Sequence, residues 1–251
     1  MEKREVQNTK HYYLDMVEVN LELEVPTSLE DIELWQYQKY MGIVKQNEEA
    51  TNPEAVDFVN RKLIEIFCDV SLKDVMNIPL KEYSKITEVL SNAFDADTPL
   101  VQRFELEGIE FGFIPNLDKM SLGEYIDIEK SILDWQNIHI AMGALFRPIT
   151  KEYDDKYRIE KYEAKEEYFN LMKFMPVSVA MGAMVFFYRL GKDLSIHTLK
   201  SLEKARTTGE LTIQEQQTLE QNGVGISRFT HLLKGMFLNS GALLKPQFIN
   251  V

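Results

Sequence analysis

The sequence contains one cysteine and no apolar run long enough to span a bilayer. Each of these shortages argues against a class of protein. Cys68 cannot form a disulfide bond within the chain. It lies in an apolar helical stretch, so we expect a buried structural thiol. Residues 1–8 are polar and lack the apolar core of a signal peptide. The most apolar stretch, 174–190, is shorter than the roughly 20 residues of a membrane span. We therefore expect a soluble cytoplasmic protein without membrane association.

Spacing patterns of catalytic and metal-binding sites are also missing from the sequence. The four histidines do not stand at a metal-ligand spacing, and there is no phosphate-binding glycine loop and no nucleophile elbow. His139 is a candidate general base, but no nucleophile lies near it in the sequence, which favours a core or interface histidine. We predict a non-enzymatic protein without a cofactor or metal. An enzyme whose ligands meet only on folding remains the rival class.

Acidic residues outnumber basic residues in the sequence. The chain has 28 Lys and Arg residues against 40 Asp and Glu residues, which gives a formal net charge of -12. This balance repels phosphate backbones and anionic membranes, so we predict no binding to nucleic acid or membranes. Salt-dependent duplex binding would instead support a DNA-binding regulator.

Hydrophobic periodicity predicts a mainly α fold of α+β character, a multi-helix domain with a small antiparallel sheet or hairpin. Alternation over 16–25 indicates a strand ending at Pro26, and Ser28 is typical of a helix N-cap. Alternation over 103–114 around Gly108 indicates a hairpin that packs on helices or pairs with the first strand. Helices are predicted from Pro53 to 67, at 71–78, 82–94, 121–135, 138–146 (stopped by Pro148), 168–175, 176–190 (capped by Gly191), 194–206, 212–222 and 228–244.

The weakest joint of the chain is the break at 206–210. We therefore predict a helical domain with a small β element over residues 1–206 and a helical C-terminal tail over 207–251. The tail docks either on the same core or on a partner.

Two apolar helices offer candidate partner-binding residues. Methionine adapts to irregular surfaces, and an exposed apolar helix face is a natural docking site for a partner helix. Core packing is the alternative for the same side chains. The candidates are Met181, Met184 and Phe187 in the apolar helix, and Leu233, Met236 and Phe237 in the last helix.

Three stretches of the sequence, together with the early helix around Trp35, form a recognisable set. They are residues 111–118 with 123–127, residues 144–150 leading to 157–162, and residues 176–187. The set resembles uncharacterised proteins from the structural-gene regions of tailed bacteriophages, including crAss-like and other phages of Bacteroidetes-type hosts. Some of these proteins look like tail assembly chaperones.

The resemblance implies a phage morphogenesis protein that acts by protein–protein contact, with tail, tape-measure or connector proteins as partners. It would shield an apolar segment of a partner in the host cytoplasm during assembly. The alternative is a virion component, such as a connector ring or a packaged internal protein. A homo-oligomer remains open. No catalytic residue is implied.

Overall fold

The computed structural model describes residues 9–15, 20–47, 53–95, 97–154 and 156–208 of the chain. These residues are mainly helical, and their strands form a two-stranded and a four-stranded antiparallel sheet. This architecture confirms the predicted fold class. Among the described residues, no helix is both long enough and apolar enough to cross a membrane.

Helices and strands follow one another in an irregular order. The strands are β1 Thr9–Asp15, β2 Asn20–Pro26, β3 Arg103–Leu106, β4 Ile109–Phe113, β5 Phe146–Tyr153 and β6 Lys156–Ile159. The α-helices are α1 Leu34–Gln46, α2 Pro53–Phe67, α3 Leu72–Asn77, α4 Leu80–Ala93, α5 Leu122–Ser131, α6 Ile138–Leu145, α7 Glu166–Leu171 and α8 Val177–Thr208. Short 3-10 helices, η1 Leu117–Lys119 and η2 Met172–Phe174, complete the set.

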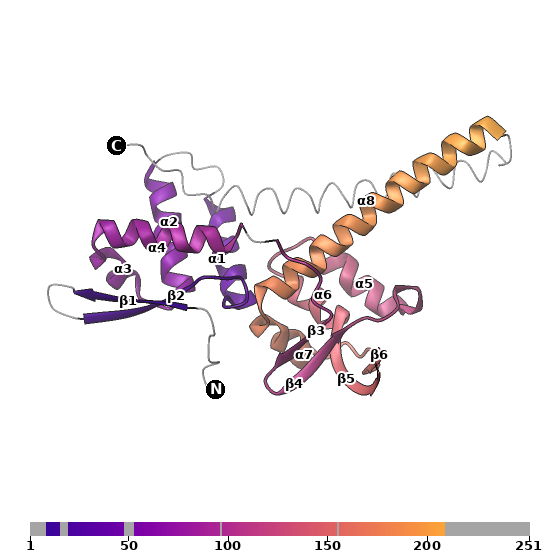
Figure 1. The fold of residues 1–251 in the computed structure, drawn as a ribbon, viewed down its shortest axis with the longest axis horizontal. Helices are drawn as coiled ribbons and strands as arrows, with labels where there is room; N and C mark the ends of the chain where they lie inside the picture. Colours follow the sequence, from indigo (N-terminus) through magenta and orange to yellow (C-terminus); the bar gives the residue numbers. More distant parts are fainter. Residues whose placement is uncertain (1–8, 16–19, 48–52, 96, 155, 209–251) are drawn as a thin grey trace.

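Figure 1 shows two groups of elements joined by α8. Helices α1–α4 and the β1–β2 hairpin make up the N-terminal group, while the sheet β3–β6 and helices α5–α7 make up the second. The first part of α8 lies in the body, and the remainder extends beyond the other described elements.

The N-terminal hairpin is only half predicted by the sequence. Strand β2 ends at Pro26 as expected, and residues 16–19 of the predicted strand lie outside the described residues. Strand β1 pairs with β2 from Thr9↔Pro26 to Asp15↔Asn20. The sequence does not predict β1, because its residues lack an alternation of polar and apolar side chains.

Helix α1 starts later than the sequence predicts. Ser28 does not cap it, because Ser28 instead donates a hydrogen bond to Asp31 in a turn (2.9 Å). The backbone N–H of Leu34 donates to the Met175 carbonyl (2.9 Å), and Val177 donates to the Ile32 carbonyl (2.9 Å). These two bonds hold Glu33 extended against Pro176 at the start of α8, so the helix begins only at Leu34.

The next three helices follow the sequence signals closely. Pro53 opens α2, where its missing N–H costs nothing. Ser71 caps α3 by accepting from the Asp74 N–H (3.2 Å), and α3 ends before Pro79 as predicted. Helix α4 begins at Leu80, slightly before the predicted start.

The predicted hairpin at 103–114 is confirmed as β3 and β4. Its turn, Glu107-Gly108, has φ values of 50° and 73°, the left-handed pair that defines a type I′ turn and favours glycine at the second position. Strand β4 pairs with β5 through Phe111↔Pro148 and Phe113↔Phe146, and not with the first strand.

Pro148 does not end α6, contrary to the prediction. The helix stops at Leu145 because Phe146 takes an extended backbone and enters β5, and Pro148 lies inside this strand. Its carbonyl accepts from the Glu160 N–H (2.9 Å), and the proline ring only removes a donor.

Helix α8 runs without interruption through Gly191, so the prediction that Gly191 caps a helix is wrong. The continuation over 194–206 is confirmed, and α8 crosses the predicted domain boundary after residue 206 and includes Thr208, the last residue that the structure describes. A mid-helix glycine costs about 1 kcal/mol relative to alanine, too little to break a helix that is anchored elsewhere. The proposed tail from 209 lies outside the described residues.

The anchor of α8 is its first half. Met184 is fully buried, and Gly182 lies so close to the Pro99 carbonyl that a Cβ atom there would overlap it. The Phe113 ring of β4 stacks edge-on against Phe186 with centroids 5.6 Å apart. The apolar stretch is therefore a buried helix that joins the sheet to the N-terminal group.

Candidate interaction surface

The start of α5 is fixed by one glutamate with two roles. Ser121 and Glu124 form a capping box: the Glu124 N–H donates to Ser121 Oγ (3.3 Å), and the Ser121 N–H donates to Glu124 Oε2 (2.5 Å). The other oxygen, Oε1, pairs with Nη2 of Arg147 on β5 (2.5 Å). Both side chains are buried. Glu124 thus links the helix cap to the sheet.

Aromatic and acidic groups surround this buried ion pair. The Arg147 guanidinium lies over the Tyr162 ring, 5.7 Å from its centroid, and the Tyr162 hydroxyl donates to Asp127 of α5. Burial lowers the pKa of Arg147, which Glu124 opposes, and burial raises the pKa of Tyr162. Breaking a buried pair by removing one partner is strongly destabilising. The cluster therefore sets the position of α5 on the sheet.

The outer side of α5 carries two large apolar side chains that the core does not use. Leu122 is 74% exposed and Tyr125 is 52% exposed, whereas Ile128 of the same helix is buried. Tyr125 donates to Glu129 one turn later (3.1 Å), which holds the ring along the helix. We call Leu122 and Tyr125 the α5 face. The buried pair Glu124–Arg147 fixes the helix beneath it, so the face is presented in one orientation.

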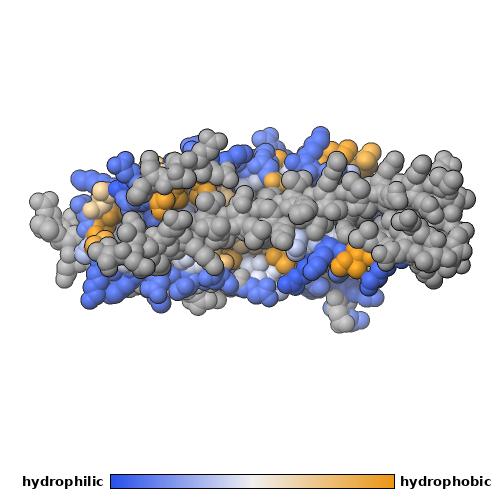
Figure 2. All heavy atoms as spheres, turned by 90° about the horizontal axis from the view of Figure 1, so that it is seen from above, coloured by the Kyte–Doolittle hydropathy of each residue, from blue (hydrophilic) through white to orange (hydrophobic). Residues whose placement is uncertain are grey.

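Other exposed apolar side chains lie apart from the α5 face. Met76 and Leu80, 59% and 79% exposed, flank Pro79 at the joint of α3 and α4. Ile109, Tyr153 and Ile196 are less exposed. Figure 2 shows separate apolar patches among predominantly hydrophilic side chains on the described surface seen there. Scattered apolar residues are normal on protein surfaces, so the α5 face is distinguished by its rigid support.

His139 belongs to a hydrogen-bonded network between α6 and α1. Gln38 Nε2 contacts His139 Nδ1 (3.0 Å) and donates to the Trp135 carbonyl (2.8 Å). Gln136 Nε2 donates a hydrogen bond to the Gln38 backbone carbonyl (2.7 Å). Burial, with a contribution from the Lys173 charge, lowers the pKa of His139 to about 4. The neutral ring joins α6 to α1, in agreement with a core histidine.

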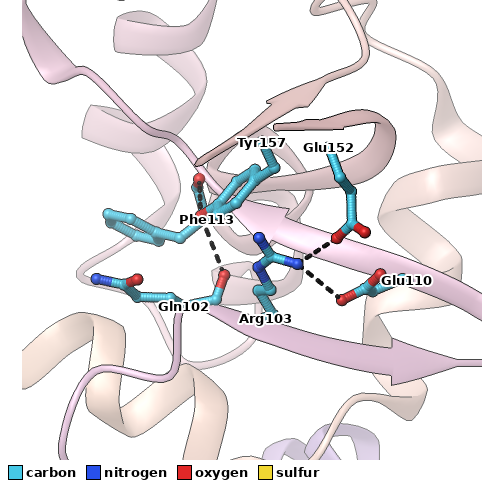
Figure 3. Close-up of polar contacts among 6 residues, drawn as sticks. All are labelled: Gln102, Arg103, Glu110, Phe113, Glu152 and Tyr157. Atoms are coloured by element: carbon cyan, nitrogen blue, oxygen red, sulfur yellow. Dashed lines mark hydrogen bonds and ion pairs between the residues drawn. The ribbon is translucent and has the colours of Figure 1, made fainter. Parts of the chain in front are cut away.

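A second polar cluster lies on the outer face of the four-stranded sheet. Arg103 forms ion pairs with Glu110 (3.6 Å) and Glu152, and its guanidinium stacks on the Tyr157 ring, 4.7 Å from the centroid (Figure 3). The Tyr157 hydroxyl donates to the carbonyl of Phe113 (2.7 Å). The tyrosine ring covers Gly112 so closely that a Cβ atom there would overlap it. These contacts tie β6 to β3 and β4 across the sheet.

The predicted partner-binding residues differ in burial, and some of them lie outside the described residues. Met181 and Met184 are buried in the core, the alternative that the sequence left open, and they offer no surface to a partner in this fold. Phe187 is half-buried, with its ring 6.3 Å from that of Phe113. The C-terminal candidates Leu233, Met236 and Phe237 lie outside the described residues.

The α5 face was missed in the sequence although a signal exists. Ser121 and Glu124 fix the start of the helix, and Ile128 then marks its inner side. On a helix with 3.6 residues per turn, Leu122 lies about 120° from Ile128 and falls outside the core stripe, whereas Tyr125 lies only about 60° from Ile128. The spacing therefore identifies Leu122 as a surface residue, and the exposure of Tyr125 comes from the structure.

Searches for chemistry and for relatives give negative findings. Within the described ranges, no group of three or more His, Cys, Asp or Glu side chains could hold a metal ion. Cys68 is buried, as expected, and burial raises the pKa of its thiol. Comparisons with protein-family models, with curated proteins and with solved structures find no match to this chain.

Proposed function

We propose that this chain is a non-enzymatic phage morphogenesis protein that acts by protein–protein contact, in the manner of a tail assembly chaperone. The observation that carries the proposal is the α5 face: Leu122 and Tyr125 are exposed on a helix whose position is set by the buried Glu124–Arg147 pair. Tyrosine is enriched at protein interfaces because its ring is apolar while its hydroxyl tolerates water. The likeness of three stretches to phage structural-region proteins supplies the biological setting.

The contact works by covering an apolar segment of the partner. The α5 face supplies two apolar side chains on a helix of fixed position, and the Tyr125 hydroxyl is already held by Glu129, so binding orders fewer groups. A net charge of -12 keeps the complex in solution and attracts basic partners. The partner is therefore an apolar segment with basic flanks in a tail, tape-measure or connector protein.

Affinity purification from infected cells tests this proposal. The tagged chain is expected to recover a phage structural protein, and replacing Leu122 and Tyr125 together by serine is expected to abolish that recovery. The matched control variant replaces Met76 and Leu80 by serine. These two side chains are similarly exposed but distant in sequence from the α5 face, so the control variant should recover the partner normally. Exposed substitutions of this kind usually change stability by about 0.5 kcal/mol or less, so loss of folding does not explain a difference.

Three outcomes contradict the proposal. Equal recovery by both double variants removes the role of the α5 face. Recovery of no structural protein removes the morphogenesis function. Mass spectrometry of purified virions decides between the two phage functions, because stoichiometric presence in the particle rules out a chaperone that departs and supports a permanent virion component.

A further inference from the structure

The two strands β5 and β6 form a ribbon whose faces differ in character. Glu152 and Tyr157 are register partners, and both point toward Arg103 on one face of the sheet (Figure 3). Side chains alternate along a strand, so their neighbours Lys151 and Arg158, themselves a register pair, lie on the opposite face. A register shift just before Lys151 accounts for this arrangement, because the extra residue of a β-bulge re-aims the side chains that follow it.

The opposite face of the ribbon is basic and contains one aromatic ring. Tyr153 pairs with Lys156, and these two side chains lie on the same face as Lys151 and Arg158. All four side chains are exposed. We call Lys151, Tyr153, Lys156 and Arg158 the basic ribbon face. It ends at the turn of the ribbon, where the exposed Asp154 has the opposite charge.

The cations of the basic ribbon face have no carboxylate partner in the part of the chain that the structure describes. The ion pairs of this sheet involve Arg103 and Arg147 instead. Like charges directly opposite each other in a sheet are destabilising, so the register pair of Lys151 and Arg158 weakens the ribbon. An anion bound beside both side chains would remove this repulsion.

The Arg158 side chain is held in a position that suits a carboxylate. Its guanidinium lies over the Tyr153 ring, 5.5 Å from the centroid. The Thr150 hydroxyl donates to the Arg158 carbonyl (3.2 Å), which fixes the backbone of β6 beside the bulge. A guanidinium stacked on a ring keeps N–H donors at its edge, and its planar fork matches the two oxygens of a carboxylate.

Strand β6 also offers a free edge among the described strands. In the order β3-β4-β5-β6 it pairs with β5 alone (Figure 1). An extended peptide can add to such an edge through backbone hydrogen bonds, while its alternate side chains decide the specificity. Lys156 and Arg158 stand two residues apart, about 7 Å along the strand. Carboxylates at alternate positions of an extended segment would therefore meet both cations.

We propose that the basic ribbon face, with the edge of β6, is a docking site for a short acidic segment of another protein, bound in extended form with carboxylates at alternate positions. The net charge of -12 restricts the occupant. A nucleic acid presents a continuous line of phosphates that reaches beyond the three cations, and a second copy has the same excess of negative charge. A short segment keeps its carboxylates at the cations, and charges more than about 8 Å away are largely screened at physiological salt. The site shares no residue with the α5 face and does not depend on the proposed function.

Fluorescence polarisation with a labelled peptide of alternating glutamate and threonine tests the site in the full chain. The test variant carries Lys156→Gln and Arg158→Gln. The matched control carries Lys73→Gln and Lys81→Gln, which removes the same charge from two exposed lysines of α3 and α4. The comparison ligands are the same peptide with glutamine in place of glutamate and a single-stranded oligothymidylate of equal charge.

The wild-type chain and the control variant should bind the acidic peptide equally, and the test variant should bind it about tenfold more weakly, because two charge-assisted contacts are lost. Equal affinity of the two variants, equal affinity for the glutamine peptide, or no binding of the acidic peptide overturns the site. Tighter binding of the oligonucleotide than of the acidic peptide overturns the choice of occupant. A concentration-dependent dimer in analytical ultracentrifugation that the test variant loses does the same, because the occupant is then a second copy.

Discussion

Acidification should weaken the fold through His139. This ring is buried between α6 and α1, and its Nδ1 faces the amide nitrogen of Gln38 at 3.0 Å. An amide nitrogen donates, so Nδ1 must accept, which it does only in the neutral ring. A proton on Nδ1 would place two donors face to face in a buried site, beside the repelling charge of Lys173.

The size of the effect follows from the pKa of His139. The folded protein lowers this pKa from 6.5 to about 4. The unfolded chain therefore binds the proton more readily, and the full stability is present above pH 6.5 and is lost as the pH falls toward 4. At about 1.4 kcal/mol per pKa unit, the loss attributable to His139 is about 3 kcal/mol.

Urea denaturation at pH 7 and pH 4.5, followed by the fluorescence of Trp35 and Trp135, measures this loss. The variant His139→Gln stays neutral and retains an acceptor for Gln38, so its free energy of unfolding should fall less on acidification than that of the wild-type chain. Titration of the carboxylates is common to both proteins and cancels in the comparison. Parallel pH dependences in the two proteins would refute the assignment of a buried neutral His139.

Three further substitutions probe the support of the α5 face and of α8. Arg147→Met should cost about 3–5 kcal/mol in urea denaturation, because the carboxylate of Glu124 stays buried without a partner; adding Glu124→Gln should recover much of that loss. Gly182→Ala should lower the thermal midpoint by several degrees, because the new methyl group meets backbone that cannot move aside. Gly112→Ala should destabilise the sheet, and Tyr157→Ala in the same chain should relieve the overlap.

Local signals in the sequence predicted most helices and the central hairpin. The capping residues Ser71 and Ser121 act over three residues, so their bonds form whatever the rest of the chain does. Gly108 likewise fixes its own turn. The errors at Ser28 and Pro148 share another cause. At both positions, pairing with distant segments, 175–177 and β4, decides where the helix starts or stops.

The candidate surface was harder to predict than the fold. Whether Met181 and Met184 face a partner or the core depends on which segments cover α8, and here these include helix α1, strand β4 and the stretch around Pro99. The exposure of Leu122 likewise depends on which side of α5 meets the sheet, and the Arg147 partner of Glu124 sets that side. Contacts between residues far apart in sequence have no local signature.

The unbroken course of α8 through Gly191 has a mechanical consequence. A continuous helix is stiff along its axis, so a force applied near Thr208 is transmitted to Met184 and Gly182, where the helix is wedged against the carbonyl of Pro99. The part of α8 beyond Gly191 then acts as a rigid lever on the hydrophobic core. A partner that pulls on this part of the helix would displace the residues around Gly182, because the described helix has no break at which it could bend.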